Sequence, residues 1–265
     1  MVSAPFPAGQ ASRAVSVLAA MTASRSEQSP SLLFSSLVVL TVMAACAPFS
    51  GAIATVASWS TTSITAIVPA GATTGAVLVT VAGMASNGST FMVLNQITYH
   101  LHNEASDINR LLRLRAAAPD SAATTLQSGN VGNSTGEIAI KAFATDPGIP
   151  GAAGSIPSGT PITFALYLRK TTGKGVIYPR VRARLNGDAG ALLCQATGTT
   201  PLTSTATRYA LSCTTSSITM TSTDRIYLWV GVNVTTAPGG NTRSELSIEG
   251  TNGATDSVVT VQIPR

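Results

Sequence analysis

One short segment of the chain matches the spacing of a catalytic serine, but its surroundings do not fit that chemistry. Gly132-Asn133-Ser134-Thr135-Gly136 follows the Gly-x-Ser-x-Gly pattern of a nucleophile elbow. Such an elbow needs a strand before the serine, a helix after it and a histidine later in the chain. Here a strand is expected after the serine, and both histidines precede it. Nor do the 11 scattered acidic residues single out a carboxylate pair for glycoside cleavage. We predict no catalytic residue and no enzyme.

His100, His102 and Glu104 alternate along the chain, as metal ligands on one face of a strand would. No source of a fourth ligand is evident in the sequence, and a polar linker is the more ordinary setting for such a segment. We therefore predict neither a metal site nor a cofactor.

Two of the three cysteines, Cys194 and Cys213, fall in expected strands that are joined by a segment rich in Thr and Gly. They are candidates for a disulfide that would close a loop of about 20 residues. The alternative is a set of reduced, buried thiols in a cytoplasmic protein. An N-terminal export signal favours the disulfide, because disulfides persist in oxidising compartments.

The third cysteine, Cys46, ends an uncharged apolar run from Leu32. This run is shorter than the roughly 20 residues of a membrane-spanning helix, and its length is typical of a signal-peptide core with Arg25 upstream. Met43-Ala44-Ala45-Cys46 also resembles a bacterial lipobox, which would make Cys46 a lipidation site. The alternative is that the run is a buried strand or an artefact of gene calling.

Aromatic and arginine side chains on the expected strands could bind a ligand. Outward positions are occupied by Tyr167, Tyr227 and Trp229, and exposed rings stack on sugars. The guanidinium groups of Arg169 and Arg182 would donate hydrogen bonds to hydroxyl or acid groups. These five residues are the candidate ligand-binding set. The alternative is that another layer of the protein covers the rings.

A basic stripe is formed by Arg180, Arg182 and Arg184, which alternate on one expected strand. They could bind carboxylate or sulfate groups of a glycan through charged hydrogen bonds. Equally, they could pair with Glu245 and Glu249 as a solvated ladder of charges, and we favour the ladder. The net charge of +5 is modest. Without basic runs interleaved with aromatics, it does not indicate nucleic-acid binding.

The composition favours an all-β protein. Only 10% of residues are charged and 5% aromatic, and Gly, Ser, Thr, Ala and Val dominate, as in short strands joined by tight turns. Helical spacing is visible only in Glu104–Ala118. Eight strands at regular spacing indicate a two-sheet sandwich; they are 137–144, 161–169, 176–185, 191–196, 207–213, 225–234, 243–250 and 257–263.

Three phrases in the second half carry a family resemblance: Thr163–Lys170, Arg208–Leu211 and Asp224–Trp229. Their order, a strand, a Tyr-bearing strand and a Tyr-x-Trp strand, resembles the galactose-binding-type jelly roll of many carbohydrate-binding modules. The resemblance covers about residues 130–265 and implies a β-sandwich that binds a glycan.

A second resemblance lies in Trp59–Val93, where Val-Pro, a turn, the β-rich run Ala76–Val81, Asn87-Gly88 and a closing Phe-x-Val follow one another. This order resembles the later part of an IPT/TIG repeat, an immunoglobulin-like fold of extracellular proteins. Asn87-Gly88 predicts a hairpin between two apolar runs. The first strands of the repeat have no counterpart, so either a sheet edge is open to other β-modules or Leu33–Ala45 replaces a strand.

These patterns divide the chain into a signal-like or irregular segment (1–48), a partial TIG-like module (49–94), a connector (95–130) and a jelly roll (131–265). We expect a non-catalytic, secreted or cell-surface protein that binds glycan or another surface partner. Its contact with membrane would be through a signal or lipid anchor only. The alternative is a structural spacer or subunit of a larger extracellular assembly.

Overall fold

Strands are the regular elements of this protein, as the composition predicts. The computed structural model describes residues 41–45, 52–60, 64–67, 72–81, 84–85, 87–119, 122–250 and 255–264. All regular elements in these residues are β-strands, and no helix there is long and apolar enough to cross a membrane. The chain divides into two compact units, Met1–Val93 and Leu94–Arg265. The all-β prediction is confirmed.

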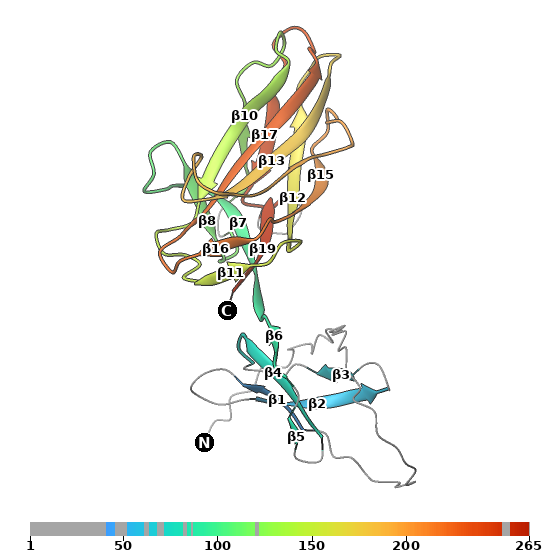
Figure 1. Cartoon of the computed structure of the whole chain (residues 1–265). Coiled ribbons are helices and arrows are strands. Elements are labelled where there is room, and N and C mark those ends of the chain that lie inside the picture. The colour runs from blue at the N-terminus through green and yellow to red at the C-terminus, as the bar shows by residue number, and fades with distance from the viewer. Residues whose placement is uncertain are drawn as a thin grey trace, which may run out of the picture. The chain divides into compact units, whose positions relative to one another are not determined.

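The first unit holds one antiparallel sheet (Figure 1). Its path is β3-β2-β1-β4-β5, and β6 pairs with β4 beside β5. The strands are β1 (Thr41–Ala45), β2 (Ala52–Trp59), β3 (Ile64–Ile67), β4 (Gly75–Val81), β5 (Met84–Ala85) and β6 (Ser89–Phe91). The segment that was expected either to be a signal core or to replace a strand therefore supplies β1, which pairs with both β2 and β4.

This position of β1 bears on the lipobox prediction. Cys46 itself lies outside the described residues, as do Leu32 to Leu40. Cleavage immediately before Cys46 would remove β1 and separate β2 from β4, because both pair with β1. Lipidation at Cys46 and a strand at Thr41–Ala45 thus exclude each other in one mature chain.

One detail of the first unit differs from the prediction. Both β5 and β6 pair with β4, so Asn87-Gly88 interrupts the returning strand and does not form the predicted hairpin. Ile67 on β3 is 42% exposed, whereas Ile64 and Val79 are half-buried. The side chain of Trp59 lies outside the described residues. The likeness to a TIG repeat stays a prediction.

In the second unit, one sheet path folds over into two layers. Its order is β14-β13-β17-β10-β8-β7-β19-β12, with β18 and β15 both paired to β12 and β9 paired to β18. These strands are β7 (Leu94–Ala105), β8 (Leu112–Arg115), β9 (Thr124–Gln127), β10 (Gly136–Ala144), β12 (Pro161–Lys170), β13 (Val176–Leu185), β14 (Leu192–Thr197), β15 (Thr207–Thr214), β17 (Ile226–Thr236), β18 (Ser244–Ile248) and β19 (Val258–Pro264). A separate pair is formed by β11 (Gly154–Ile156) and β16 (Ile218–Met220).

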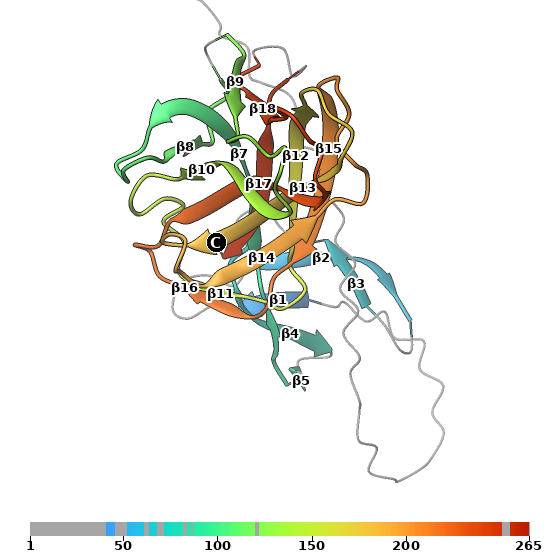
Figure 2. The ribbon, with the colours of Figure 1, turned by 90° about the horizontal axis from the view of Figure 1, so that it is seen from above.

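The two layers enclose the core (Figures 1 and 2). One layer contains β14, β13, β17 and β10, and the other contains β7, β19, β12 and β15. In β12, β13 and β17 alternate residues are fully buried, because successive side chains of a strand point to opposite faces. These inner residues, such as Phe164, Val181 and Leu228, form one hydrophobic cluster. All eight strands predicted after residue 130 are present, with ends shifted by one or two residues.

The prediction of a connector between residues 95 and 130 is wrong. It supplies β7, β8 and β9, and β7 pairs with β19 and β8 inside the main sheet. Tyr99 and Leu101 are buried on β7, and they alternate with polar residues as in a strand, a short signal that the prediction of a connector did not use. The helical spacing of Glu104–Ala118 does not correspond to a helix: Arg110 has a positive φ of 68°, which a right-handed helix excludes.

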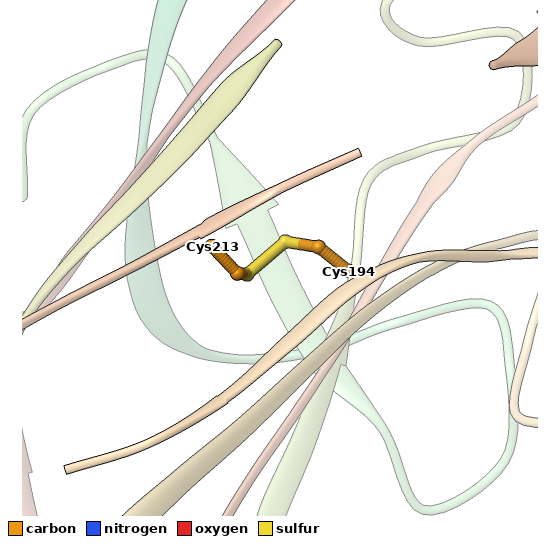
Figure 3. The surroundings of a disulfide bond; sticks show 2 residues. All are labelled: Cys194 and Cys213. Carbon is orange, nitrogen blue, oxygen red and sulfur yellow. A yellow bond between two sulfur atoms is a disulfide. The ribbon is translucent and has the colours of Figure 1, made fainter. Parts of the chain in front are cut away.

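A disulfide joins one layer of the second unit to the other (Figure 3). Cys194 lies on β14 and Cys213 on β15, with Cα atoms 5.8 Å apart. The predicted bond is confirmed, but the two strands are not an antiparallel pair, since β14 pairs with β13 and β15 pairs with β12. The bond therefore links the edge strand of one layer to the edge strand of the other.

We expect the Cys194→Ser/Cys213→Ser double variant to unfold more easily than the oxidised protein. The bond spans 19 positions of sequence, and losing a cross-link of this span costs about 3 kcal/mol of stability. Chemical denaturation of the oxidised chain and the double variant measures the difference. Cys46→Ser, which removes the third thiol, is the matched control. Equal unfolding midpoints for all three proteins would show that the disulfide does not stabilise the fold.

Candidate binding site

The five predicted ligand-binding residues do not form one site. Tyr167 and Arg169 lie on β12, whereas Arg182 lies on β13 and Tyr227 and Trp229 lie on β17. β12 and β17 belong to different layers. The prediction of one ligand-binding set is therefore wrong, because β12 pairs with β15, β18 and β19, whereas β17 pairs with β10 and β13.

Tyr227 points away from the core but is still buried, with 5% of its surface exposed. Ala144 and Arg184 are its neighbours on the two adjoining strands. Burial raises the pKa of the Tyr227 hydroxyl, and the negative charge of Asp188 raises it further. With so little of its surface exposed, the ring offers no open face to a sugar.

Trp229 is half-buried and packs against its own strand. A Cβ atom added to Gly231 would lie 2.3 Å from Cη2 of the indole, so the ring extends over the backbone of Gly231. The guanidinium of Arg182 lies over the ring, 4.8 Å from its centroid, in the geometry of a cation–π contact. The indole thus forms part of a packed outer face.

The arginine stripe forms the expected ladder of charges with a different partner. Arg180 and Arg182 both form ion pairs with Glu137 on β10. β17 lies between β13 and β10, and Gly231, which has no side chain, faces Arg180 in the register. Arg184 instead donates to the carbonyl oxygen of Gly190 at 2.8 Å.

The two glutamates expected in that ladder are used elsewhere. Glu245 forms an ion pair with Arg169 and accepts a hydrogen bond from Gln127 at 2.9 Å. Glu249 accepts a hydrogen bond from the backbone N–H of Asn103 at 2.7 Å. Both carboxylates are buried, so these bonds satisfy charges that would otherwise be costly to bury.

The residues with metal-ligand spacing have separate partners. His100 contacts Asp256, His102 Nε2 lies 3.1 Å from the carbonyl oxygen of Ala117, and Glu104 pairs with Arg115 at 2.8 Å. Among the residues that the structure describes, no group of His, Cys, Asp and Glu could hold a metal ion. Ser134 precedes β10, so a strand follows it where an elbow would have a helix.

A groove of about 280 Å³ lies on the outer face of β15, β12 and β19. Ala165 and Ala210 are register partners in its middle, and Thr163 and Ser212 are partners in the next row. These small side chains leave the groove open between larger neighbours. Its outer lining is completed by Arg208 of β15 and by Val258 and Thr260 of β19.

Sequence reasoning missed this groove. The signal was present as small residues at the outward positions of two strands, Thr163 and Ala165 in one and Ala210 and Ser212 in the other. Only the pairing of β12 with β15 brings them together. One predicted residue does lie beside the groove: Tyr167 is the register partner of Arg208.

The architecture defines this protein as an all-β chain with a jelly-roll-type β-sandwich. No protein family model matches the chain, and no curated protein matches it.

Several solved structures match part of the chain. A CocE/NonD family hydrolase from Staphylococcus aureus has a TM-score of 0.44 and 9% identity, covering 67% of this chain and 39% of the hydrolase. An aminopeptidase from a marine sediment Thaumarchaeota archaeon has a TM-score of 0.42 and 9% identity, covering 64% and 37%. A CBM4 structure has a TM-score of 0.25 and 17% identity, covering 47% of this chain and 89% of the CBM4. The chain thus spans well under half of the first two proteins, and these likenesses identify no activity.

Gly231→Ala tests whether the outer face of the first layer is packed as described. The new methyl group would lie 2.4 Å from the carbonyl oxygen of Ile138 as well as against the indole of Trp229. We expect a loss of about 1–3 kcal/mol in the free energy of unfolding, measured by chemical denaturation. Gly129→Ala is the control, because its Cβ would meet nothing within 4 Å. Similar stabilities of the two variants would disprove this packing.

Proposed function

We propose that this chain is a non-catalytic, exported or cell-surface protein whose jelly-roll unit binds a glycan. The observation that carries the proposal is the groove across β15, β12 and β19, which is hollow and lined by both hydroxyl and methyl groups. Its volume of about 280 Å³ is near the lower end of small-molecule pockets, roughly 300–1,000 Å³. It suits one small cyclic unit, such as a sugar residue within a longer chain.

The chemistry of the lining supports a sugar. Thr163, Ser212 and Thr260 bring hydroxyl groups to the groove, while Ala165 and Ala210 give it an apolar middle. A sugar ring has apolar C–H faces and a rim of hydroxyl groups, so it makes use of both. Binding pockets combine an apolar surface with a few polar groups that fix orientation in the same way.

Export is supported by the disulfide between Cys194 and Cys213. Such bonds persist in extracellular and periplasmic compartments and are rare in the cytosol. A jelly roll that binds glycan outside the cell would meet its ligand there, so location and ligand are mutually consistent.

The alternative function is a structural spacer in a larger extracellular assembly. It is favoured by the covering of Tyr227 and Trp229, since the two rings expected to bind a ligand are used in packing within the unit. In that case the first unit would contact other β-modules through an edge of its sheet, and the groove would have no ligand.

Ala210→Trp separates the two functions. Ala210 is exposed and lines the groove, so an indole at this position would fill the space without disturbing the core. We expect the full chain to bind at least one polysaccharide of an immobilised panel, and the variant to lose at least tenfold in affinity with an unchanged melting temperature.

Ala139→Trp is the matched control, because Ala139 is exposed on the other layer, opposite Gly231. Its binding should equal that of the wild type. If Ala139→Trp alone abolishes binding, the ligand occupies the outer face of the other layer, which carries Arg180 and Arg182. If the wild-type chain binds no polysaccharide, the glycan proposal fails.

The intact mass of the protein from its native host tests export. We expect one disulfide and a processed N-terminus. A signal core that ends at Cys46 would be cut on its C-terminal side and would take β1 with it, so a mature chain that keeps the sheet of the first unit must begin before Thr41. Two hydrogen atoms fewer than the reduced mass would report the disulfide. A chain that still begins at Met1 with three free thiols would contradict export, and one that begins at Cys46 would contradict the position of β1.

A further inference from the structure

The strand-borne arginines of the second unit differ in whether their guanidinium groups have partners. Arg113 and Arg115 pair with Glu104, and Arg169 pairs with Glu245. The arginines of β13 bond to Glu137 or to a carbonyl oxygen. Across the described part of the chain, the side chain of Arg208 has no hydrogen bond or ion pair, although it is exposed and lines the groove.

Arg208 is the charged residue in the lining of the groove. The outer lining otherwise consists of small hydroxyl and apolar residues, and it includes no acidic side chain. Two carboxylates on or next to the strands that adjoin β12 already have partners: Glu245 is bound by Arg169 and Gln127, and Asp256, just before β19, contacts His100. Nothing among the described residues therefore neutralises the guanidinium at this edge of the groove.

We propose that the groove binds an acidic sugar, a hexuronate unit of a polysaccharide, whose carboxylate is held by Arg208. This inference rests on the proposed glycan function and narrows its ligand class. A guanidinium presents two parallel N–H donors that match the two oxygens of a carboxylate. The hydroxyl groups of Thr163 and Ser212 then lie along the groove from Arg208, where the ring hydroxyls of the same sugar extend.

The arrangement also explains why an arginine is suited to this position. Its neighbour across the strand pair is Tyr167, and side chains directly opposite on an antiparallel pair lie close together. The Tyr167 ring, which is half-buried, therefore borders the same end of the groove as the guanidinium. A charged donor beside an aromatic edge fits a ligand with an acid group and an apolar ring face.

A matched pair of oligosaccharides tests the inference. Oligogalacturonate and the corresponding galactose oligomer differ in the group at one carbon, which is a carboxylate in the first and a CH₂OH in the second. We expect the full chain to bind oligogalacturonate more tightly by calorimetry, and Arg208→Gln to lower that affinity about tenfold. The variant should bind both oligomers equally, and Arg208→Lys should fall between.

Arg110→Gln is the control for net charge. Arg110 is also exposed and without a partner in the described residues, but it lies between β7 and β8, outside the groove lining. If both glutamine variants weaken binding equally, the effect is that of overall charge and the inference is overturned.

The inference and the glycan function fail in different ways. If both oligomers bind equally, Arg208→Gln changes neither affinity and Ala210→Trp abolishes both, the groove binds neutral sugar and the acid inference alone is overturned. If the full chain binds oligogalacturonate and no neutral oligomer, and Arg208→Gln abolishes that binding, both are supported. If it binds neither these oligomers nor any glycan of the panel, the proposed function fails as well.

Discussion

Burial of alternate residues between two layers is the constraint on which the second unit depends. β12, β13 and β17 each place every second side chain in one hydrophobic cluster, and removal of this apolar surface from water is the dominant favourable term in folding. A shift of one residue in any of these strands would turn its apolar side chains outward. The register of the outer faces is therefore set by the inner ones.

The outer face of the first layer shows how a fixed register places polar groups. Gly231 leaves room for the indole of Trp229, and the guanidinium of Arg182 covers that indole. Glu137 then neutralises both Arg180 and Arg182 from the far side of β17. Rings and charges that suggest a binding surface in the sequence satisfy one another here, which leaves few free donors for a ligand.

The outer face of the second layer has the opposite character. Where β15, β12 and β19 meet, paired small residues produce a hollow, and the charged group at its edge, Arg208, has no partner among the described residues. The disulfide between Cys194 and Cys213 holds β15 to β14 of the other layer. It therefore fixes the strand that supplies one wall of the groove, so stability and the proposed binding depend on the same strand.

The sequence by itself determined the strands from residue 137 onward, because period-two alternation is a local pattern. It also determined the pairing of two cysteines, because a chain with three cysteines allows few pairings. The shorter alternation around Tyr99 and Leu101 in β7 was interpreted as part of a polar connector, and the partners of the arginines were not evident in the sequence. The groove was decided by tertiary structure alone: Ala165 and Ala210 lie 45 positions apart and become neighbours only because β12 pairs with β15. Which strands adjoin depends on how two layers bury their inner faces together, and no local pattern specifies that.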